Sequence, residues 1–188
     1  MSREVHVRFC EQRRGKIPPL TLLVVLLKGN GRRALQTIRL MLQRLGLEVH
    51  PDKTRIVDAR KGFDFLSVHF RVRKTRKRGS RLMFSCRLWP SDAAMVRVKQ
   101  KIRDRIGRRY GLALKEMIEE LNPLIRGWNT YHRKRIRFGI ERKRFESLNY
   151  FVRDRLRIFL KRKYNDRTRA EWRLRDNLPE RLGLCRFG

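Results

Sequence analysis

Hydrophobic and polar positions change their period along this chain. The apolar run LTLLVVLL at residues 20–27 has the length and β-branched content of a buried strand, and the turn residues KGNG end it. Residues 32–47 then repeat apolar side chains at helical spacing, with Gly46 placed as a C-terminal cap. The pattern predicts a strand followed by a helix that buries Leu35, Ile38, Leu42 and Leu45.

Short strands are predicted farther along the chain. Segments 49–57 and 63–73 are each typical of one strand, and residues 81–89 are typical of a return strand. The basic segment 73–80 predicts the loop of a β-hairpin. Residues 1–19 show no period, and we expect them to form a poorly ordered leader.

Helical patterns dominate after Pro90. Residues 114–121 predict a short acidic helix. Asn122 and Pro123 are suited to the N-cap and first turn of a separate helix, so a new helix is predicted to start there. Before these, Ser91 is a favourable N-cap for a helix with an apolar stripe of Met95, Val98, Ile102 and Ile106.

Residues 141–164 predict the last long helix, followed by a short irregular tail. Its inward face would contain Phe145, Leu148, Val152, Leu156, Phe159 and Leu160. Its cationic side would contain the candidate RNA-binding residues Arg153, Arg157, Lys161 and Arg162. The order of elements predicts an α+β fold, in which a small sheet and hairpin precede a mainly helical region.

The net charge of the chain indicates which class of partner it binds. A formal net charge of +32 favours a polyanion, and nucleic acid is the expected one, although a ribosomal or nucleoid protein would show a similar balance. Six of the eight residues 71–78 are Lys or Arg, which is either a solvated hairpin tip or a phosphate contact. We favour RNA or DNA contact for Arg73, Lys74, Arg76, Lys77 and Arg78.

Neither a metal site nor a membrane span is predicted. Cys10, Cys86 and Cys185 are widely spaced, without a CxxC pair or a nearby His, and are expected to be buried thiols in a reducing compartment. The run at 20–27 falls far short of the roughly 20 residues that cross a bilayer. We therefore expect a cytoplasmic protein with no cofactor.

The stretch LNPLIRGWNTYHR, residues 121–133, places a glycine inside a predicted helix. Gly127 costs helix stability relative to Ala, so either helix packing or the close approach of RNA is the reason for it. We favour packing for Gly127, Trp128 and Tyr131. RNA contact is favoured over an ordinary solvated face for Arg126, Asn129, Arg133 and Lys134.

This stretch, followed by FESLNYFVRDRLRIFLKRKY, resembles the maturase-specific domain of the reverse transcriptases that group II introns, which are mobile genetic elements, encode. GFDFLSVHFRVR, the basic loop and RLMFSCRLWPS are similar to the segment that joins palm to thumb in that family. LGLEVHPDKTRIV is similar to a palm motif that contains a lysine, here Lys53. The resemblance runs from about residue 22 to about residue 185.

The resemblance implies a division of the chain and a role in RNA splicing. Residues 1–21 form an unmatched leader, 22–73 a residual palm, 74–110 the basic hairpin and thumb helix, and 111–188 the maturase-specific domain. In the family, thumb and maturase domain grip the intron RNA and help it to fold, with Pro123, Gly127, Trp128 and Tyr131 inside the matching motif.

Polymerase chemistry is not expected. Nucleotidyl transfer with two metal ions needs paired carboxylates, which the family places in a Tyr-Ala-Asp-Asp turn before the strand that resembles LLVVLLKG. Here RRGKIPPLT stands in that place, and no aspartate occurs before Asp52. Lys53 is then a basic residue of the residual palm, and no residue is assigned to catalysis or to a metal.

The leading hypothesis is a truncated, non-catalytic maturase fragment that binds group II intron RNA. One alternative is the C-terminal half of a split or frame-shifted RNA-directed DNA polymerase, with an upstream reverse transcriptase chain as partner. Another is a generic basic RNA-binding protein. A DNA target remains open as a further partner.

Overall fold

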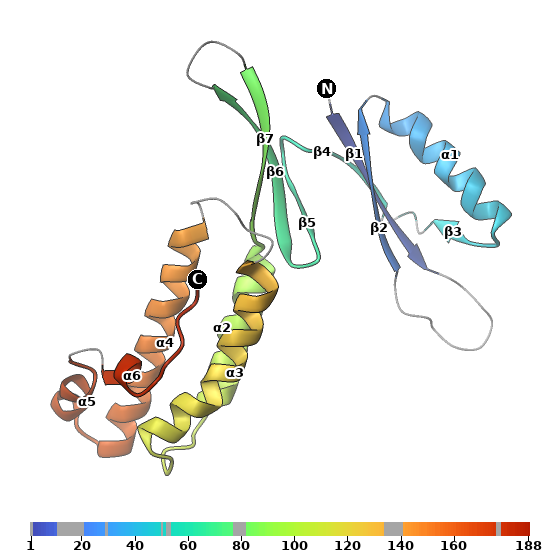
Figure 1. The fold of residues 1–188 in the computed structure, drawn as a ribbon. Coiled ribbons are helices and arrows are strands. Elements are labelled where there is room, and N and C mark those ends of the chain that lie inside the picture. The colour runs from blue at the N-terminus through green and yellow to red at the C-terminus, as the bar shows by residue number, and fades with distance from the viewer. Residues whose placement is uncertain are drawn as a thin grey trace. The chain divides into compact units, whose positions relative to one another are not determined.

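A computed structural model describes residues 2–10, 21–28, 30–49, 51, 54–76, 82–133, 141–175 and 178–188. The fold class is α+β, as predicted. The chain divides into two compact units (Figure 1). The first unit comprises Met1–Phe63 and Phe70–Arg87, and the second, here called the helical unit, comprises Asp64–His69 and Leu88–Gly188.

The first unit contains a sheet with strand β1 (Ser2–Cys10) in its interior. β1 pairs antiparallel with β2 (Thr21–Lys28), with Val5 opposite Val25. On its other side β1 pairs with β3 (Glu48–Val49) and β4 (Arg55–Asp58). The strand expected in the apolar run is confirmed as β2, and β1 satisfies the backbone hydrogen-bonding groups along one of its edges.

The leader prediction is wrong for Ser2–Cys10, which form β1. The signal for a strand is present in the sequence, since Val5, Val7 and Phe9 alternate with polar residues. Alternation over so short a segment was too weak to predict a strand without its partner. Residues 11–20 lie outside the described part of the chain.

Helix α1 (Gly31–Arg44) follows β2 as predicted. Its C-terminus has the predicted glycine cap, because Gly46 has φ +70° and Leu47 N–H donates to Leu42 O over 2.9 Å. Leu45 is 72 % exposed, so it does not belong to the packed face. That face contains Leu35, Ile38 and Leu42, which pack with Leu27 of β2 and Val49 of β3.

Both segments that were predicted as single strands are interrupted. Segment 49–57 divides into β3 and β4, with Pro51 between them. Segment 63–73 divides into β5 (Phe63–Phe65) and β6 (Val68–Arg76), joined by a tight turn at Leu66 and Ser67 with positive φ at both residues.

The predicted hairpin is confirmed by β7 (Leu82–Pro90), which completes the three-stranded antiparallel sheet β5-β6-β7. Residues 77–81, which separate β6 from β7 in the sequence, are not among the described residues. Cys86 on β7 is exposed and Cys185 is partly buried, so the expectation of buried thiols is wrong for Cys86.

Three long helices supply most of the core of the helical unit. They are α2 (Asp92–Ile106), α3 (Leu114–Arg133) and α4 (Glu141–Tyr164), followed by α5 (Arg167–Arg173) and α6 (Leu178–Arg181) (Figure 1). The predicted stripe of α2 is confirmed as buried. The predicted inward face of α4 is also confirmed, with Phe145 only partly buried.

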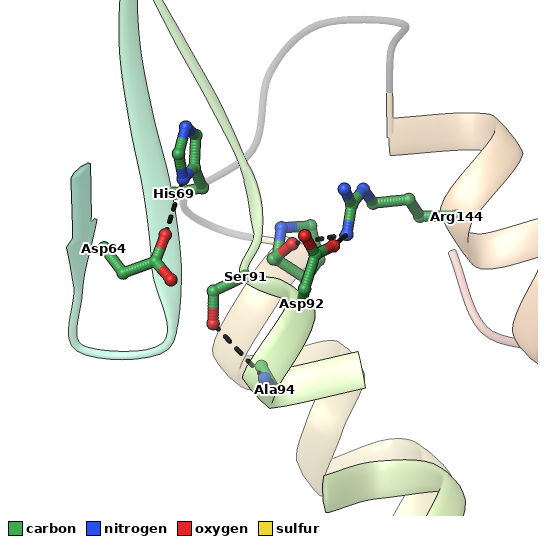
Figure 2. A network of polar contacts seen from close by, with 7 residues as sticks. Asp64, His69, Ser91, Asp92, Ala94 and Arg144 are labelled. Carbon is green, nitrogen blue, oxygen red and sulfur yellow. Dashed lines mark hydrogen bonds and ion pairs between the residues drawn. The ribbon is translucent and has the colours of Figure 1, made fainter. Parts of the chain in front are cut away.

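Figure 2 shows how side chains fix the start of α2. Ser91 is the predicted N-cap, and its Oγ accepts a hydrogen bond of 3.2 Å from Ala94 N–H. The Arg144 guanidinium of α4 donates to the Asp92 carboxylate over 2.6 Å and to Pro90 O over 3.1 Å. These contacts connect the end of β7, the first turn of α2 and the first turns of α4.

One prediction fails at Pro123, which lies inside α3 rather than at the start of a new helix. Met117, Ile118, Leu121 and Ile125 are fully buried on one continuous face. Burial of such side chains contributes about 1.5–3 kcal/mol each, which together exceeds the roughly 3 kcal/mol cost of a proline in a helix interior. Packing therefore overrides the local helix-start signal.

The continuity of α3 predicts a stabilising effect of Pro123→Ala. In the middle of a helix this change restores a backbone donor and removes a steric conflict, so the free energy of unfolding should rise by about 1–3 kcal/mol. Urea denaturation followed by far-ultraviolet circular dichroism measures it. Thr130→Ala, an exposed change on the same helix, calibrates an ordinary gain in helix propensity. If Pro123→Ala gives no more than this control, α3 is not continuous in solution.

Candidate nucleic-acid interface

Three asparagines hold the C-terminal segment against the long helices; we call this arrangement the asparagine clasp. Asn122 of α3 donates from Nδ2 to Gly183 O over 2.9 Å and accepts from Cys185 N–H over 2.8 Å. Asn149 of α4 bonds both backbone groups of Phe187, at 3.0 and 2.8 Å. Each side-chain amide thus supplies a donor and an acceptor to the backbone, as a neighbouring strand would.

Asn129 is the third member of the clasp. Its Nδ2 donates to Arg186 O over 2.7 Å, and its Oδ1 accepts from Gly188 N–H over 3.2 Å. Nearby, Arg126 Nε donates to Cys185 Sγ over 3.2 Å. Two residues expected to contact RNA are therefore engaged with the C-terminal segment, and their contact with RNA stays a prediction.

Aromatic side chains connect the same helix to its neighbours. The half-buried Trp128 ring lies 4.1 Å from His132, 5.4 Å from Phe145 and 5.2 Å from Phe187, measured between centroids. Tyr131 OH donates to Leu66 O in the β5–β6 turn. These contacts give Trp128 and Tyr131 packing partners within the helical unit.

Gly127 differs from its two aromatic neighbours. It is exposed, and a Cβ added there would meet no heavy atom within 4 Å beyond adjacent residues and the local helix backbone. Helix packing therefore gives no reason for glycine at this position among the described residues.

The basic hairpin is only partly described. Arg73 and Lys74 are exposed on β6, and Lys74 Nζ lies 5.9 Å from the centroid of the Phe84 ring on β7. Arg76 ends β6 and Arg133 ends α3. The remaining predicted cations, Lys53, Lys77, Arg78 and Lys134, lie outside the described residues.

The predicted cations of α4 have different surroundings. Arg153 donates to Leu174 O over 2.7 Å, and Arg162 donates to the Tyr110 hydroxyl over 2.7 Å. The hydrogen bond that Arg157 donates to Asp154 raises the pKa of the guanidinium above its ordinary value. Arg157 and the exposed Lys161 line a pocket of about 280 Å³ together with Arg167. The structure therefore brings together only part of the predicted set.

A second group of cations was not predicted from the sequence. The partly buried Phe151 ring of α4 has Lys99, Arg103 and Arg155 around it, at 5.5, 5.1 and 5.9 Å from its centroid. We call these four residues the Phe151 cluster. Lys99 and Arg103 are four residues apart on α2, so helical spacing could have grouped them; their proximity to α4 required the tertiary structure.

Exposed aromatic rings accompany these charges. Tyr150 is 75 % exposed and Trp172 is 63 % exposed. Arg169 lies over the Tyr164 ring at 4.6 Å from its centroid. Cations combined with accessible rings are what single-stranded or looped RNA requires, because phosphates pair with the charges and bases stack on the rings.

Two other kinds of site are absent from the part of the chain that the structure describes. Those residues contain no group of three or more His, Cys, Asp or Glu side chains that could hold a metal ion. Among the described helices, none is both long and apolar enough to cross a membrane.

Comparison with protein families gives one match. Residues 95–178 match the group II intron, maturase-specific domain. A search of curated proteins finds no match. The matched stretch includes most of α2 and all of α3, α4 and α5, and thus the Phe151 cluster and the three asparagines of the clasp. Over these residues, the resemblance to the maturase-specific domain that the sequence showed is confirmed.

Proposed function

We propose that the chain binds group II intron RNA through its helical unit and assists the folding of that RNA for splicing, in the cytoplasm. The match of residues 95–178 to the maturase-specific domain is the observation that supports this most directly. The net charge of +32 supports a polyanionic partner, since neutralised phosphates release counterions and so favour binding.

The Phe151 cluster is the surface that we propose for RNA contact first. Its three cations come from two helices and meet at one ring, so a phosphate there would interact with several positive charges at once. Arg73, Lys74, Lys161 and Arg162 remain proposed contacts. Arg126, Asn129 and Arg153 act first within the protein, because they bond the segments that follow α4.

We further propose that the chain binds without polymerising. In the segment that resembles a palm, residues 22–73, the first carboxylates are Glu48 and Asp52, well beyond the strand where the family has its aspartate pair. The residual palm and the thumb, residues 74–110, remain proposals that rest on the sequence resemblance.

One observation favours the alternative in which a separate reverse transcriptase chain is the partner. Leu40, Met41 and Leu45 of α1 and its C-cap are 56 %, 60 % and 72 % exposed. Exposed apolar side chains on one helix can form a surface that another protein covers. This would leave RNA binding by the helical unit unchanged.

Intron preference tests the proposed function. The chain should bind folded group II intron RNA at least about tenfold more tightly than an RNA of equal length and composition with scrambled sequence, because shaped RNA positions several phosphates at once. Filter-binding competition at fixed salt measures this ratio. Equal competition by both RNAs would contradict the maturase role and leave a generic RNA-binding protein.

A second prediction concerns the Phe151 cluster. Replacing Lys99, Arg103 and Arg155 together by Gln should reduce the dependence of log affinity on log salt by about 0.7–0.9 for each phosphate that is no longer neutralised, roughly 2–3 in total. The matched control replaces the exposed Arg32, Arg33 and Arg39 of α1 by Gln, with the same change in charge. If both variants reduce the salt dependence equally, binding depends on total charge and not on the position of the Phe151 cluster.

A third prediction concerns polymerisation. The purified chain should extend no primer on an RNA template with Mg²⁺ or Mn²⁺, since its palm-like segment lacks the carboxylate pair that two metal ions require. Extension of a labelled primer measures this, with an active reverse transcriptase as control. Template-dependent extension by this chain alone would overturn the non-catalytic assignment.

A further inference from the structure

A pocket of about 420 Å³ opens between α2, α3 and the β5–β6 turn in the helical unit. Its volume lies within the range of about 300–1,000 Å³ that is usual for small-molecule sites. The half-buried Leu124 contributes apolar surface and the half-buried Trp128 contributes aromatic surface, with the buried Val98 and His132 behind them. The exposed Arg97 and Lys101, one helical turn apart on α2, add positive charge.

Arg97 is held in place at this pocket. Its Nη2 donates to Ser67 Oγ over 2.8 Å. Ser67 belongs to the β5–β6 turn, where Leu66 and Ser67 have φ of +46° and +66°, values that side-chain-bearing residues seldom adopt. Ser91 N–H donates to Ser67 O over 2.9 Å, and Tyr131 OH donates to Leu66 O. These contacts fix the turn and, through it, the guanidinium.

Gly127 lines the same pocket. It lies within α3, where glycine is less favourable than alanine, and its φ is not in the left-handed region that favours glycine. A Cβ there would enter open space. Neither backbone conformation nor packing in the described structure explains why residue 127 is glycine. A glycine does keep the pocket wall free of a side chain, and this explains it.

We propose that this pocket binds one unstacked nucleotide of single-stranded RNA, with the base against Trp128 and its phosphate on Arg97 and Lys101. The lining favours this occupant because, among the described residues that form it, cations and rings occur together without a carboxylate. The proposal rests on RNA binding as the proposed function and adds a defined subsite to it.

Blocking the pocket is the first test. Gly127→Leu places a good helix former at the pocket wall, so it should keep or raise the melting temperature while weakening binding of a short single-stranded oligoribonucleotide by about 5- to 150-fold, the effect of losing one stacked base. Thr130→Leu adds the same side chain to an exposed position of α3 outside the pocket and should leave affinity unchanged. Unchanged affinity in a folded Gly127→Leu protein overturns the proposal.

The charge of the pocket provides a second variant should Gly127→Leu fail to fold. Lys101→Gln should weaken binding more than Lys143→Gln, an exposed lysine on α4 that does not line the pocket. Both variants lose one positive charge. Equal losses count against the subsite.

Fluorescence of Trp128 distinguishes which part of a nucleotide occupies the pocket. In a protein with Trp89→Phe and Trp172→Phe, the oligoribonucleotide should quench Trp128, while an abasic ribose-phosphate oligomer of equal length should not, because only a base can stack on the ring. Adenosine monophosphate forms the third arm: saturable quenching by it alone, with none by the oligomer, would assign the pocket to a free nucleotide instead. Equal quenching by the abasic oligomer would reduce the site to phosphate binding.

The two proposals fail in different ways. If intron RNA is preferred over scrambled RNA but Gly127→Leu binds as the unmodified chain does, the maturase role stands and the subsite is wrong. If both RNAs bind equally and Gly127→Leu still loses affinity for the oligoribonucleotide, the subsite stands in a generic RNA-binding protein.

Discussion

One constraint shapes the helical unit: the backbone N–H and C=O groups of residues 183–188 need hydrogen-bond partners. Residues 183–188 form no helix or strand, yet Phe187 is buried within the core. Buried backbone groups without partners cost free energy, and the amides of Asn122, Asn129 and Asn149 supply both a donor and an acceptor each. At about 0.5–1.5 kcal/mol per bond, the clasp is a substantial fraction of the stability of a domain of ordinary size.

The clasp explains why the stretch at 121–133 has its composition. Asparagines at 122 and 129 are spaced by two helical turns, so both reach the same segment of chain, and Trp128 lies against Phe187, which that segment places in the core. Tyr131 points to a different partner, the β5–β6 turn. One helix thus positions the C-terminal segment and a β-turn, while its glycine leaves space beside them.

Sequence patterns predicted what depends on local periodicity. The stripes of α2 and α4, the Ser91 cap and the Gly46 cap are encoded within a few turns of the residues concerned, and the structure has them. The start of a helix at Asn122 was wrong because a strong local signal was overridden by a buried face on both sides of Pro123. β1 was missed because a short alternating segment is stabilised by strand partners distant in sequence.

Less of the candidate site could be predicted from the sequence, because its contacts also join residues that are distant in sequence. Asn129 bonds residues 57 and 59 positions away, and Phe151 meets cations of α2 about fifty positions earlier. Residue type alone indicated that Asn129 and Arg126 could bond RNA, but not that the protein itself would use those groups first. The match to the maturase-specific domain named the same family without distinguishing these roles.

The chemistry of the clasp makes the docking of the C-terminal segment largely independent of salt, whereas binding of a polyanion to a strongly basic protein depends on salt. Its six hydrogen bonds join neutral amides to neutral backbone groups, so ionic screening weakens them little. Contact between lysine or arginine and phosphate is weakened steeply by added salt. If the proposed RNA binding holds, a rise in ionic strength would release the RNA while the C-terminal segment stays docked, so that the same surface could bind again.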